Sequence, residues 1–220
     1  MSGGNMDRYC LIITGGDFCE LPDDLKNKTP ACVIACDIGW RYAERLGLAP
    51  DLAVGDFDSA PAPEGVPVKR VPSRKDDTDT MLAVKEALAA GFREIVILCA
   101  FGGRWDHTVA NLQSGAYAVK SGAVRVRLTG ADTEALVIAP EAGPVKLPRR
   151  ADRSLSLFAL SDRVEGLSLK GTKYDGEELA LESSFPLGVS NHWTAAEAEI
   201  SFRDGILLVI QSKLKDGEHI

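Results

Sequence analysis

The order of strand and helix patterns changes part-way along the chain, and this change most constrains the fold. In the first half, apolar runs at Tyr9–Thr14, Ala31–Cys36 and Glu94–Ala100 alternate with helical patterns at Asp77–Ala90 and Asp106–Lys120. Strands that are apolar throughout, with helices between them, are typical of a parallel sheet covered on both faces. We therefore expect an N-terminal α/β domain with three layers around a parallel sheet.

The second half has strand patterns without helices between them. We predict strands at 124–129, 133–139, 154–159, 164–169, 198–202 and 206–211. Arg203–Gly205 predicts a hairpin turn that joins the last two strands. Strands in this arrangement favour a C-terminal antiparallel β-sandwich. Three prolines and a glycine gather in Pro140–Pro148, so the predicted domains are residues 1–140 and 141–220.

Composition argues against several classes of protein. The net charge of −7 is opposite to the basic face of most nucleic-acid-binding proteins. The first ten residues lack a basic segment followed by a long apolar one, so we expect no signal peptide and no membrane span. The cysteines are odd in number, at five, and no two have the CxxC spacing of a zinc site. Four of them lie in or beside apolar runs, which favours reduced core thiols in a cytoplasmic protein.

Aspartates follow the predicted strands and open the next helix. Asp37 follows one strand, Asp56 and Asp58 follow another, and Asp76 and Asp79 lie near the start of a helix. Ligands of an open parallel sheet bind at the carboxyl ends of its strands, so these side chains can converge on one crevice. Asp-x-Asp in an extended loop places two carboxylates on one side, where Mg²⁺ and a polyphosphate would offset their repulsion. The alternative for this segment alone is a pair of solvated turn residues.

Two further segments have the residue types of a phosphate site. Asp77 or Thr78 can cap a helix, but capping does not explain why Lys75 lies in the same turn, where it can neutralise phosphate. In Phe101–His107, paired glycines allow close backbone approach and Arg104 offers two parallel donors to phosphate oxygens. Asp106 can orient Arg104 or His107, and the alternative for His107 is a helix-capping role. The segment lacks the GxxxxGK[ST] pattern of a P-loop, so we expect another kind of phosphate site.

One loop of the second half, Gly188–Trp193, combines small polar residues with a large aromatic one. Ser190 and Asn191 can form hydrogen bonds with a heteroaromatic ring, and Trp193 can stack on it. The alternative is an ordinary turn with a core tryptophan.

Taken in this order, the motifs resemble those of the thiamine pyrophosphokinase family. The matching segments are CDIGW (36–40), PDLAVGDFDS (50–59), RKDDTDT (74–80), FGGRWDH (101–107), GTKYDGEELAL (171–181) and GVSNHW (188–193). The resemblance implies a catalytic α/β domain, a β-sandwich that helps to bind thiamine, and a homodimer with active sites at the interface. Two positions depart from the family pattern: Ile38, where a second glycine is common, and His192, where an acidic or small residue is common.

The resemblance also implies roles for individual residues. The Mg·ATP cluster is Asp37, Asp56, Asp58, Asp76 and Asp79; the rest of the ATP side is Ser59, Thr78, Gly102, Gly103, Arg104, Asp106 and His107; the thiamine side is Ser190, Asn191 and Trp193. We expect Asp56, Asp58 and Asp79 to bind Mg²⁺. Lys75 and Arg104 would offset phosphate charge.

The predicted reaction is attack of the thiamine hydroxyl on the β-phosphorus of ATP, which gives thiamine diphosphate and AMP. Asp37 and Asp76 are both candidates for the general base. Two other functions are alternatives, and the same acidic cluster would serve the first of them. One is a pyrophosphokinase that acts on another heterocyclic alcohol, such as a pterin. The other is a non-catalytic nucleotide-binding sensor, which would have no need for clustered acids.

Overall fold

The computed structural model describes residues 8–57, 61–70 and 77–215. These residues divide into two compact units, one that ends at Ala131 and one that begins at Asp132. The strand β7 (Thr133–Ile138), which the boundary at residue 140 would assign to the first domain, therefore belongs to the second unit. Each unit is described by itself below.

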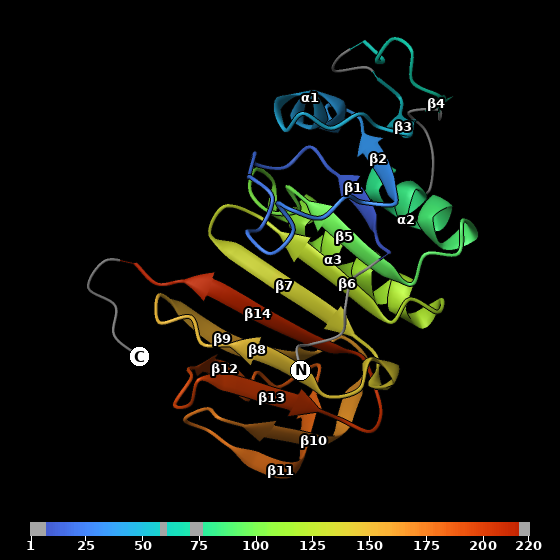
Figure 1. Cartoon of the computed structure of the whole chain (residues 1–220). Helices are drawn as coiled ribbons and strands as arrows, with labels where there is room; N and C mark the ends of the chain where they lie inside the picture. The colour runs from blue at the N-terminus through green and yellow to red at the C-terminus, as the bar shows by residue number, and fades with distance from the viewer. Residues whose placement is uncertain (1–7, 58–60, 71–76, 216–220) are drawn as a thin grey trace. The chain divides into compact units, whose positions relative to one another are not determined.

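The first unit is built on a parallel sheet, as the apolar runs predicted. Its strands follow the order β4 (Val68–Arg70), β3 (Leu52–Gly55), β2 (Cys32–Cys36), β1 (Cys10–Ile13), β5 (Glu94–Leu98) and β6 (Arg125–Thr129), as Figure 1 shows. Every pair of neighbours in this order is parallel. The register aligns Cys10 of β1 with Cys32 of β2 and with Ile95 of β5.

Three helices cover this sheet. They are α1 (Gly39–Arg45), α2 (Asp79–Ala89) and α3 (Trp105–Lys120). Ala43 of α1 packs with Leu11, Ile13 and Val33 in one apolar cluster on one face of the sheet. Helices α2 and α3 pack against each other, and α2 also packs against β1, β2 and β3. The arrangement gives the three layers that alternating strands and helices predict.

The sheet order creates a crevice between β1 and β5. From β1 the chain adds β2, β3 and β4 on one side and then returns to add β5 and β6 on the other. The loops after β1 and β5 therefore leave in opposite directions. Such a point in an open α/β sheet is the usual place for a ligand.

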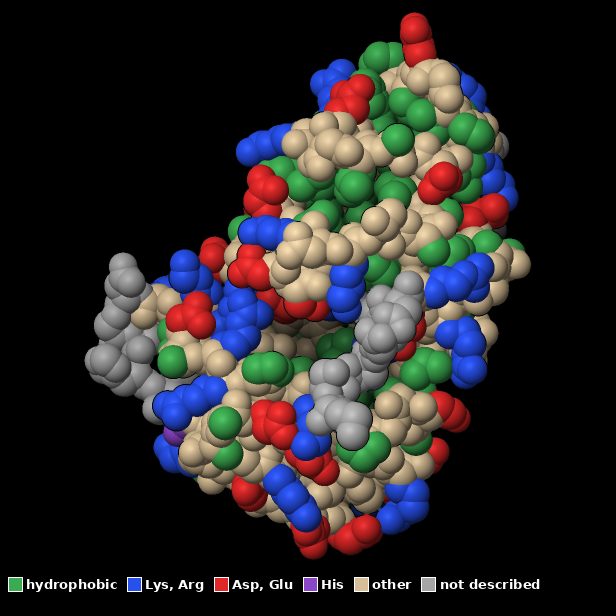
Figure 2. Space-filling model, in the orientation of Figure 1, with side chains coloured by type: hydrophobic (Ala, Val, Ile, Leu, Met, Phe, Trp, Pro, Cys, Tyr) green, Lys and Arg blue, Asp and Glu red, His purple; other side chains and the backbone are tan. Residues whose placement is uncertain are grey.

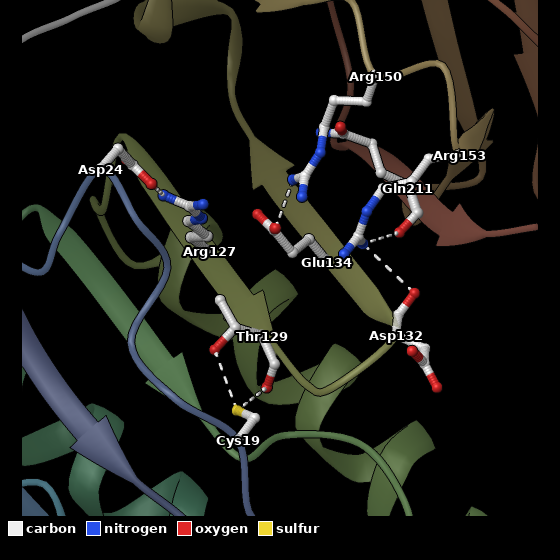
Figure 3. Close-up of polar contacts among 9 residues, drawn as sticks. All are labelled: Cys19, Asp24, Arg127, Thr129, Asp132, Glu134, Arg150, Arg153 and Gln211. Carbon is white, nitrogen blue, oxygen red and sulfur yellow. Dashed lines mark hydrogen bonds and ion pairs between the residues drawn. The ribbon is translucent and has the colours of Figure 1, made fainter.

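The segment between β1 and β2 is held against β5 and β6 by cysteines and an ion pair. Cys19 and Cys99 place their sulfur atoms 3.8 Å apart, and the Cys19 thiol also lies 3.8 Å from the Thr129 carbonyl oxygen. Arg127 of β6 binds Asp24 at 2.8 Å, and Figure 3 shows the Thr129 and Arg127 contacts. All five cysteines are free, in keeping with the prediction of reduced thiols.

The second unit is a sandwich of two antiparallel sheets. One sheet has the order β12 (Gly188–Asn191), β9 (Arg153–Ala159), β14 (Leu207–Lys213) and β7; the other has β11 (Gly176–Glu182), β10 (Arg163–Lys170), β13 (Glu197–Ser201) and β8 (Val145–Pro148). Side chains from both sheets form one core, which includes Leu157 and Val209 of the first and Leu167 and Ile200 of the second. Buried Arg153 donates to the carbonyl oxygens of Asp132 and Gln211, which ties β9 to β14 (Figure 3).

The hairpin expected at Arg203–Gly205 is not formed. Strand β13 pairs with β8 and β10, whereas β14 pairs with β7 and β9, so this turn carries the chain from one sheet to the other. The Arg203 amide bonds to the Glu165 carbonyl at 2.9 Å, which holds the turn against β10. A local turn signal does not say which strand lies alongside the one that follows.

Candidate active site

A cleft of about 430 Å³ opens at the carboxyl edge of the parallel sheet, and the residues that line it come from the first unit alone. They are Thr14–Asp17 after β1, Cys36–Ile38 at the end of β2, Asp56 after β3, Thr78–Thr80 at the start of α2, Ala100, Gly102 and Gly103 after β5, and Arg104, His107, Ala110 and Asn111 at the start of α3 or within it. The cleft thus lies where the strand order predicts a ligand site.

The loops after β1 and β5 are joined by backbone hydrogen bonds. The Gly16 amide donates to the Cys99 carbonyl at 3.1 Å, and the Asp17 amide donates to Phe101 at 2.9 Å. The Tyr42 hydroxyl of α1 donates to the Gly16 carbonyl at 3.1 Å. Burial raises the pKa of that phenol, so Tyr42 stays a donor. These bonds fix the glycine loop as one wall of the cleft.

Three residues just beyond the strand ends have left-handed backbone conformations. Asp37 follows β2 with φ 44°, Phe57 follows β3 with φ 54°, and Cys99 follows β5 with φ 58°. Left-handed backbone costs a residue with a side chain about 1–2 kcal/mol, and such strain clusters at functional sites. The strain is concentrated at the cleft edge of the sheet.

Carboxylates line the part of the cleft beside β2, β3 and α2. Asp37, Asp56 and Asp79 are all in its wall, and the Cys36 thiol lies 3.6 Å from the Asp79 carbonyl, which places the start of α2 beside the end of β2. Thr78 also lines the cleft, and it caps α2 through a 3.1 Å bond from the Met81 amide.

This set of donors suits a hard cation, although no three acidic, histidine or cysteine groups come together as a ready metal site within residues 8–57, 61–70 and 77–215. Mg²⁺ needs only one or two carboxylates, because water and phosphate oxygens complete its shell. Asp58, Ser59, Lys75 and Asp76, which the sequence also assigned to the site, lie outside the described residues.

Arg104 lines the cleft, and two of its guanidinium nitrogens bind one carboxylate. Its Nε and a terminal nitrogen both bind the Asp106 carboxylate, the first at 3.1 Å, and the His107 amide donates to the same carboxylate at 3.0 Å. The bond from Arg104 holds the pKa of Asp106 below its ordinary value. Asp106 thus orients Arg104, as one of the two sequence alternatives proposed. Gly102 and His107 line the cleft beside them.

Sequence reasoning missed several lining residues. Thr14–Asp17 was interpreted only as the end of a strand, although a Gly-Gly pair after the first strand of an α/β sheet is a signal for close ligand approach. Asn111 was assigned to no role. It is 7% exposed and lies on the buried face of α3, where a polar residue is itself a signal. Ile38 lines the cleft and packs over Gly15, where a Cβ would lie 2.9 Å from its side chain.

In the second unit, Asn191 organises two loops. Its side-chain oxygen accepts from the Tyr174 amide at 3.2 Å and the His192 amide at 2.9 Å, and its nitrogen donates to Thr172 at 3.0 Å. Asn191 is 4% exposed, so its amide is used within the protein, whereas neighbouring Ser190 is exposed and has φ 60°. The two residues expected to act together therefore differ in accessibility.

Trp193 lies in the core of the sandwich rather than on its surface. It is 4% exposed, and its indole nitrogen donates to the Leu147 carbonyl at 3.0 Å. This placement supports the alternative of a core tryptophan over stacking on a ligand ring. Tyr174, by contrast, is an aromatic residue at the surface: it is 59% exposed and is tied through its amide to Asn191.

The charge distribution on the surface and the length of the helices also bear on what the sequence predicts. On the face drawn in Figure 2, Lys and Arg side chains are interspersed with Asp and Glu over the residues that are coloured. Among the described residues, no helix is both long and apolar enough to cross a membrane.

Comparison with known proteins gives the family. Residues 24–127 match the family model for the thiamin pyrophosphokinase catalytic domain, and residues 144–207 match the model for the thiamin pyrophosphokinase vitamin B1 binding domain. The structure of a thiamin pyrophosphokinase family protein from Enterococcus faecalis is 32% identical, with a TM-score of 0.75 over 94% of this chain and 100% of that chain. This chain belongs to the thiamine pyrophosphokinase family. The resemblance of the motifs is thereby confirmed, as is the fold class.

Two relatives from Bacillus subtilis agree with this membership. The thiamine pyrophosphokinase of strain 168 is 28% identical over 210 residues, which are 91% of this chain and 97% of that protein. A crystal structure of thiamine pyrophosphokinase from Bacillus subtilis has a TM-score of 0.79, is 28% identical, and covers 93% of this chain and 99% of that chain. Within this thiamine pyrophosphokinase family member, most of the cleft residues lie in the catalytic match, while Ser190, Asn191 and Tyr174 lie in the vitamin B1 match.

Proposed function

We propose that this enzyme transfers the pyrophosphoryl group of ATP to the hydroxyl of thiamine, with thiamine diphosphate and AMP as products. The observation that carries the proposal is the coincidence of the acidic cleft with the catalytic family match, together with a separate vitamin B1 binding match. That second match favours thiamine over a pterin-like alcohol. The carboxylates beside the glycine loop favour a catalyst over a nucleotide sensor.

Asp56, Asp58 and Asp79 are the proposed ligands of Mg²⁺, and two of them line the cleft. When bound, Mg²⁺ neutralises charge on the phosphates and aligns them for in-line displacement. Carboxylate oxygens are suitable donors for this ion, which is hard and keeps several water and phosphate ligands.

Arg104, Gly102 and Gly103 are the proposed phosphate contacts on the other side of the cleft. The amides of a loop that opens a helix bind anions, and α3 begins at Trp105 directly after this loop. Arg104, held by Asp106, presents its remaining N–H groups to phosphate oxygens without a search of side-chain conformations. Lys75 is proposed to offset charge on the same phosphates.

The thiamine hydroxyl needs a base that accepts its proton as the bond to phosphorus forms. Asp37, in the cleft wall at the end of β2, and Asp76 are both proposed for this role. The thiazolium is cationic, so a cleft lined by carboxylates also attracts it. Ser190 and Tyr174 are the proposed contacts for thiamine rings in the vitamin B1 binding unit.

A homodimer with active sites at its interface is proposed on the resemblance and on one surface feature. Trp105 is 83% exposed and Val109 is 51% exposed on α3, next to the cleft residues Arg104 and His107. Large apolar side chains at this exposure favour a partner surface. Light scattering should report a dimer, and Trp105→Asp should shift it towards monomer with loss of activity.

A cytoplasmic location is proposed because the five thiols are free, including Cys19 and Cys99, which lie close enough to contact. The decisive experiment for the whole proposal is an AMP-release assay with ATP, Mg²⁺ and thiamine. Thiamine-dependent AMP and thiamine diphosphate in equal amounts support it. AMP release that depends on a pterin alcohol but not on thiamine overturns the thiamine assignment, and nucleotide binding without turnover supports a sensor.

A further inference from the structure

Asn111 has an unusual place on α3. The buried positions of the helix are Asn111, Ser114, Gly115, Ala118 and Val119, which form one face at helical spacing. Small and apolar residues occupy most of that face, whereas Asn111 carries a polar amide that is 7% exposed. A buried amide is costly unless its donors and acceptors are satisfied.

The amide of Asn111 is satisfied on one side only. Its Nδ2 donates to the Ala100 carbonyl at 2.8 Å, which fixes the side chain against the end of β5. No described residue donates to its Oδ1. This oxygen retains contact with solvent, and the residue lines the cleft, so the acceptor is held at the cleft wall. A pre-oriented acceptor in a ligand cleft is suited to a ligand that brings a hydrogen-bond donor.

We propose that Asn111 Oδ1 accepts a hydrogen bond from the adenosine part of ATP, an inference that rests on the proposed function. The Mg²⁺-bound triphosphate is deprotonated near neutral pH and has no hydrogen to donate, whereas the adenine amino group and the ribose hydroxyls are donors. Asn111 lies in the catalytic match at 24–127, apart from the vitamin B1 match at 144–207, which favours the nucleotide over thiamine.

The sheet order separates Asn111 from the proposed metal ligands. Asp56 follows β3, whereas Asn111 is bonded to Ala100 beyond β5, and β1 and β2 lie between β5 and β3. Three strand spacings amount to about 14 Å. An extended ATP molecule can span that distance, with its metal-bound phosphates beside the carboxylates and its nucleoside beside Asn111.

The test compares wild type, Asn111→Ala and Asn111→Ser with four triphosphates. These are ATP, purine riboside triphosphate, which lacks the amino group, 2′-deoxy-ATP and 3′-deoxy-ATP. Binding of each with Mg²⁺ is measured by calorimetry, and KM is measured by AMP release. The two variants should weaken ATP about 3- to 10-fold and leave the thiamine KM unchanged. Wild type should bind one of the analogues more weakly than ATP by a similar factor. The variants should bind that analogue no more weakly than they bind ATP.

The identity of that analogue reports whether the amino group or a hydroxyl is the donor. Ser114→Ala is the matched control, because Ser114 donates to Ala110 at 2.8 Å on the same buried face and does not line the cleft. It should change stability without changing nucleotide selectivity. An equal loss with all four triphosphates in the Asn111 variants would overturn the inference. Wild type that binds ATP with the expected selectivity but does not turn over would contradict the proposed function alone.

Discussion

The Gly16 amide donates to the Cys99 carbonyl at 3.1 Å, and this bond joins the loops on either side of the β1–β5 crevice. A Cβ on Gly16 would lie 2.2 Å from that carbonyl oxygen and 2.6 Å from the Phe101 oxygen. Both obstacles are backbone atoms, so they cannot move aside as a flexible side chain can. The glycine is therefore required by the closeness of two backbones, and the shape of the cleft depends on it.

Gly16→Ala should move the 14–17 loop and reduce kcat/KM for ATP by at least about 10-fold, because catalysis is sensitive to small displacements. Gly47→Ala is the control: its Cβ would meet no atom within 4 Å, but its φ of 69° is strained for alanine. It should cost about 1 kcal/mol of stability and leave kinetics unchanged. Wild-type kinetics in Gly16→Ala would show that the cleft does not depend on this contact.

The carboxylates should control the dependence on metal. Asp56→Asn and Asp79→Asn should each lower kcat by about 100-fold and raise the Mg²⁺ concentration needed for half-maximal activity, because each removes charge that stabilises the transition state. Asp23→Asn is the control, since Asp23 pairs with Lys26 at 2.6 Å on the surface. Mg²⁺ titrations of AMP release, with circular dichroism to check folding, make the measurement. Unchanged Mg²⁺ dependence in both cleft variants rules out their assignment as ligands.

The pair of Arg104 and Asp106 should matter through orientation as well as charge. Arg104→Lys keeps the charge but loses the planar two-point bond to Asp106, so we expect the KM for ATP to rise about 3- to 10-fold. Asp106→Asn weakens the same bond and should have an effect of similar size. In the double variant the two losses should not add, because both remove one interaction. Fully additive effects would mean that the residues act separately.

The fold was predictable from the sequence because its signals are strong and local. Apolar runs such as Glu94–Ala100 lie at the centre of a covered sheet, and the helical pattern at Asp77–Ala90 contains α2, which ends at Ala89. The hairpin predicted at Arg203–Gly205 was wrong, because turn residues determine a change of chain direction but not the strand that pairs with the next one. Strand β12, with exposed Val189 and Ser190, lacked the apolar pattern of a strand and was missed.

The site was predictable only where residue type and position agree. Asp56 and Arg104 have chemistry suited to phosphate and metal, and both line the cleft. Asn111 was missed because a single asparagine within a helix indicates no function by itself. Its position becomes informative only when the structure places it beside Ala100. Trp193 shows the reverse case, because a tryptophan near polar residues fits a ligand site and a core equally well, and only burial distinguishes the two.

The last prediction separates two aromatic residues of the vitamin B1 binding unit, Trp193 and Tyr174. Trp193→Phe keeps most of the ring packing but removes the indole hydrogen bond to the Leu147 carbonyl. The loss of one hydrogen bond costs about 0.5–1.5 kcal/mol, so the variant should unfold at lower temperature or denaturant concentration. Both substrates should keep their KM values in the folded fraction, because the indole lies in the core.

Tyr174→Ala should have the opposite profile. Its ring is 59% exposed, so the melting temperature should change little, whereas the thiamine KM should rise about 3- to 30-fold. Tyr174→Ala removes the stacking of an aromatic ring on a cationic or flat heterocycle, and Tyr174→Phe should retain most of that stacking. The ATP KM should stay unchanged, since the ATP cleft is lined by the first unit. A thiamine KM that responds to Trp193→Phe but not to Tyr174→Ala would return the stacking role to Trp193.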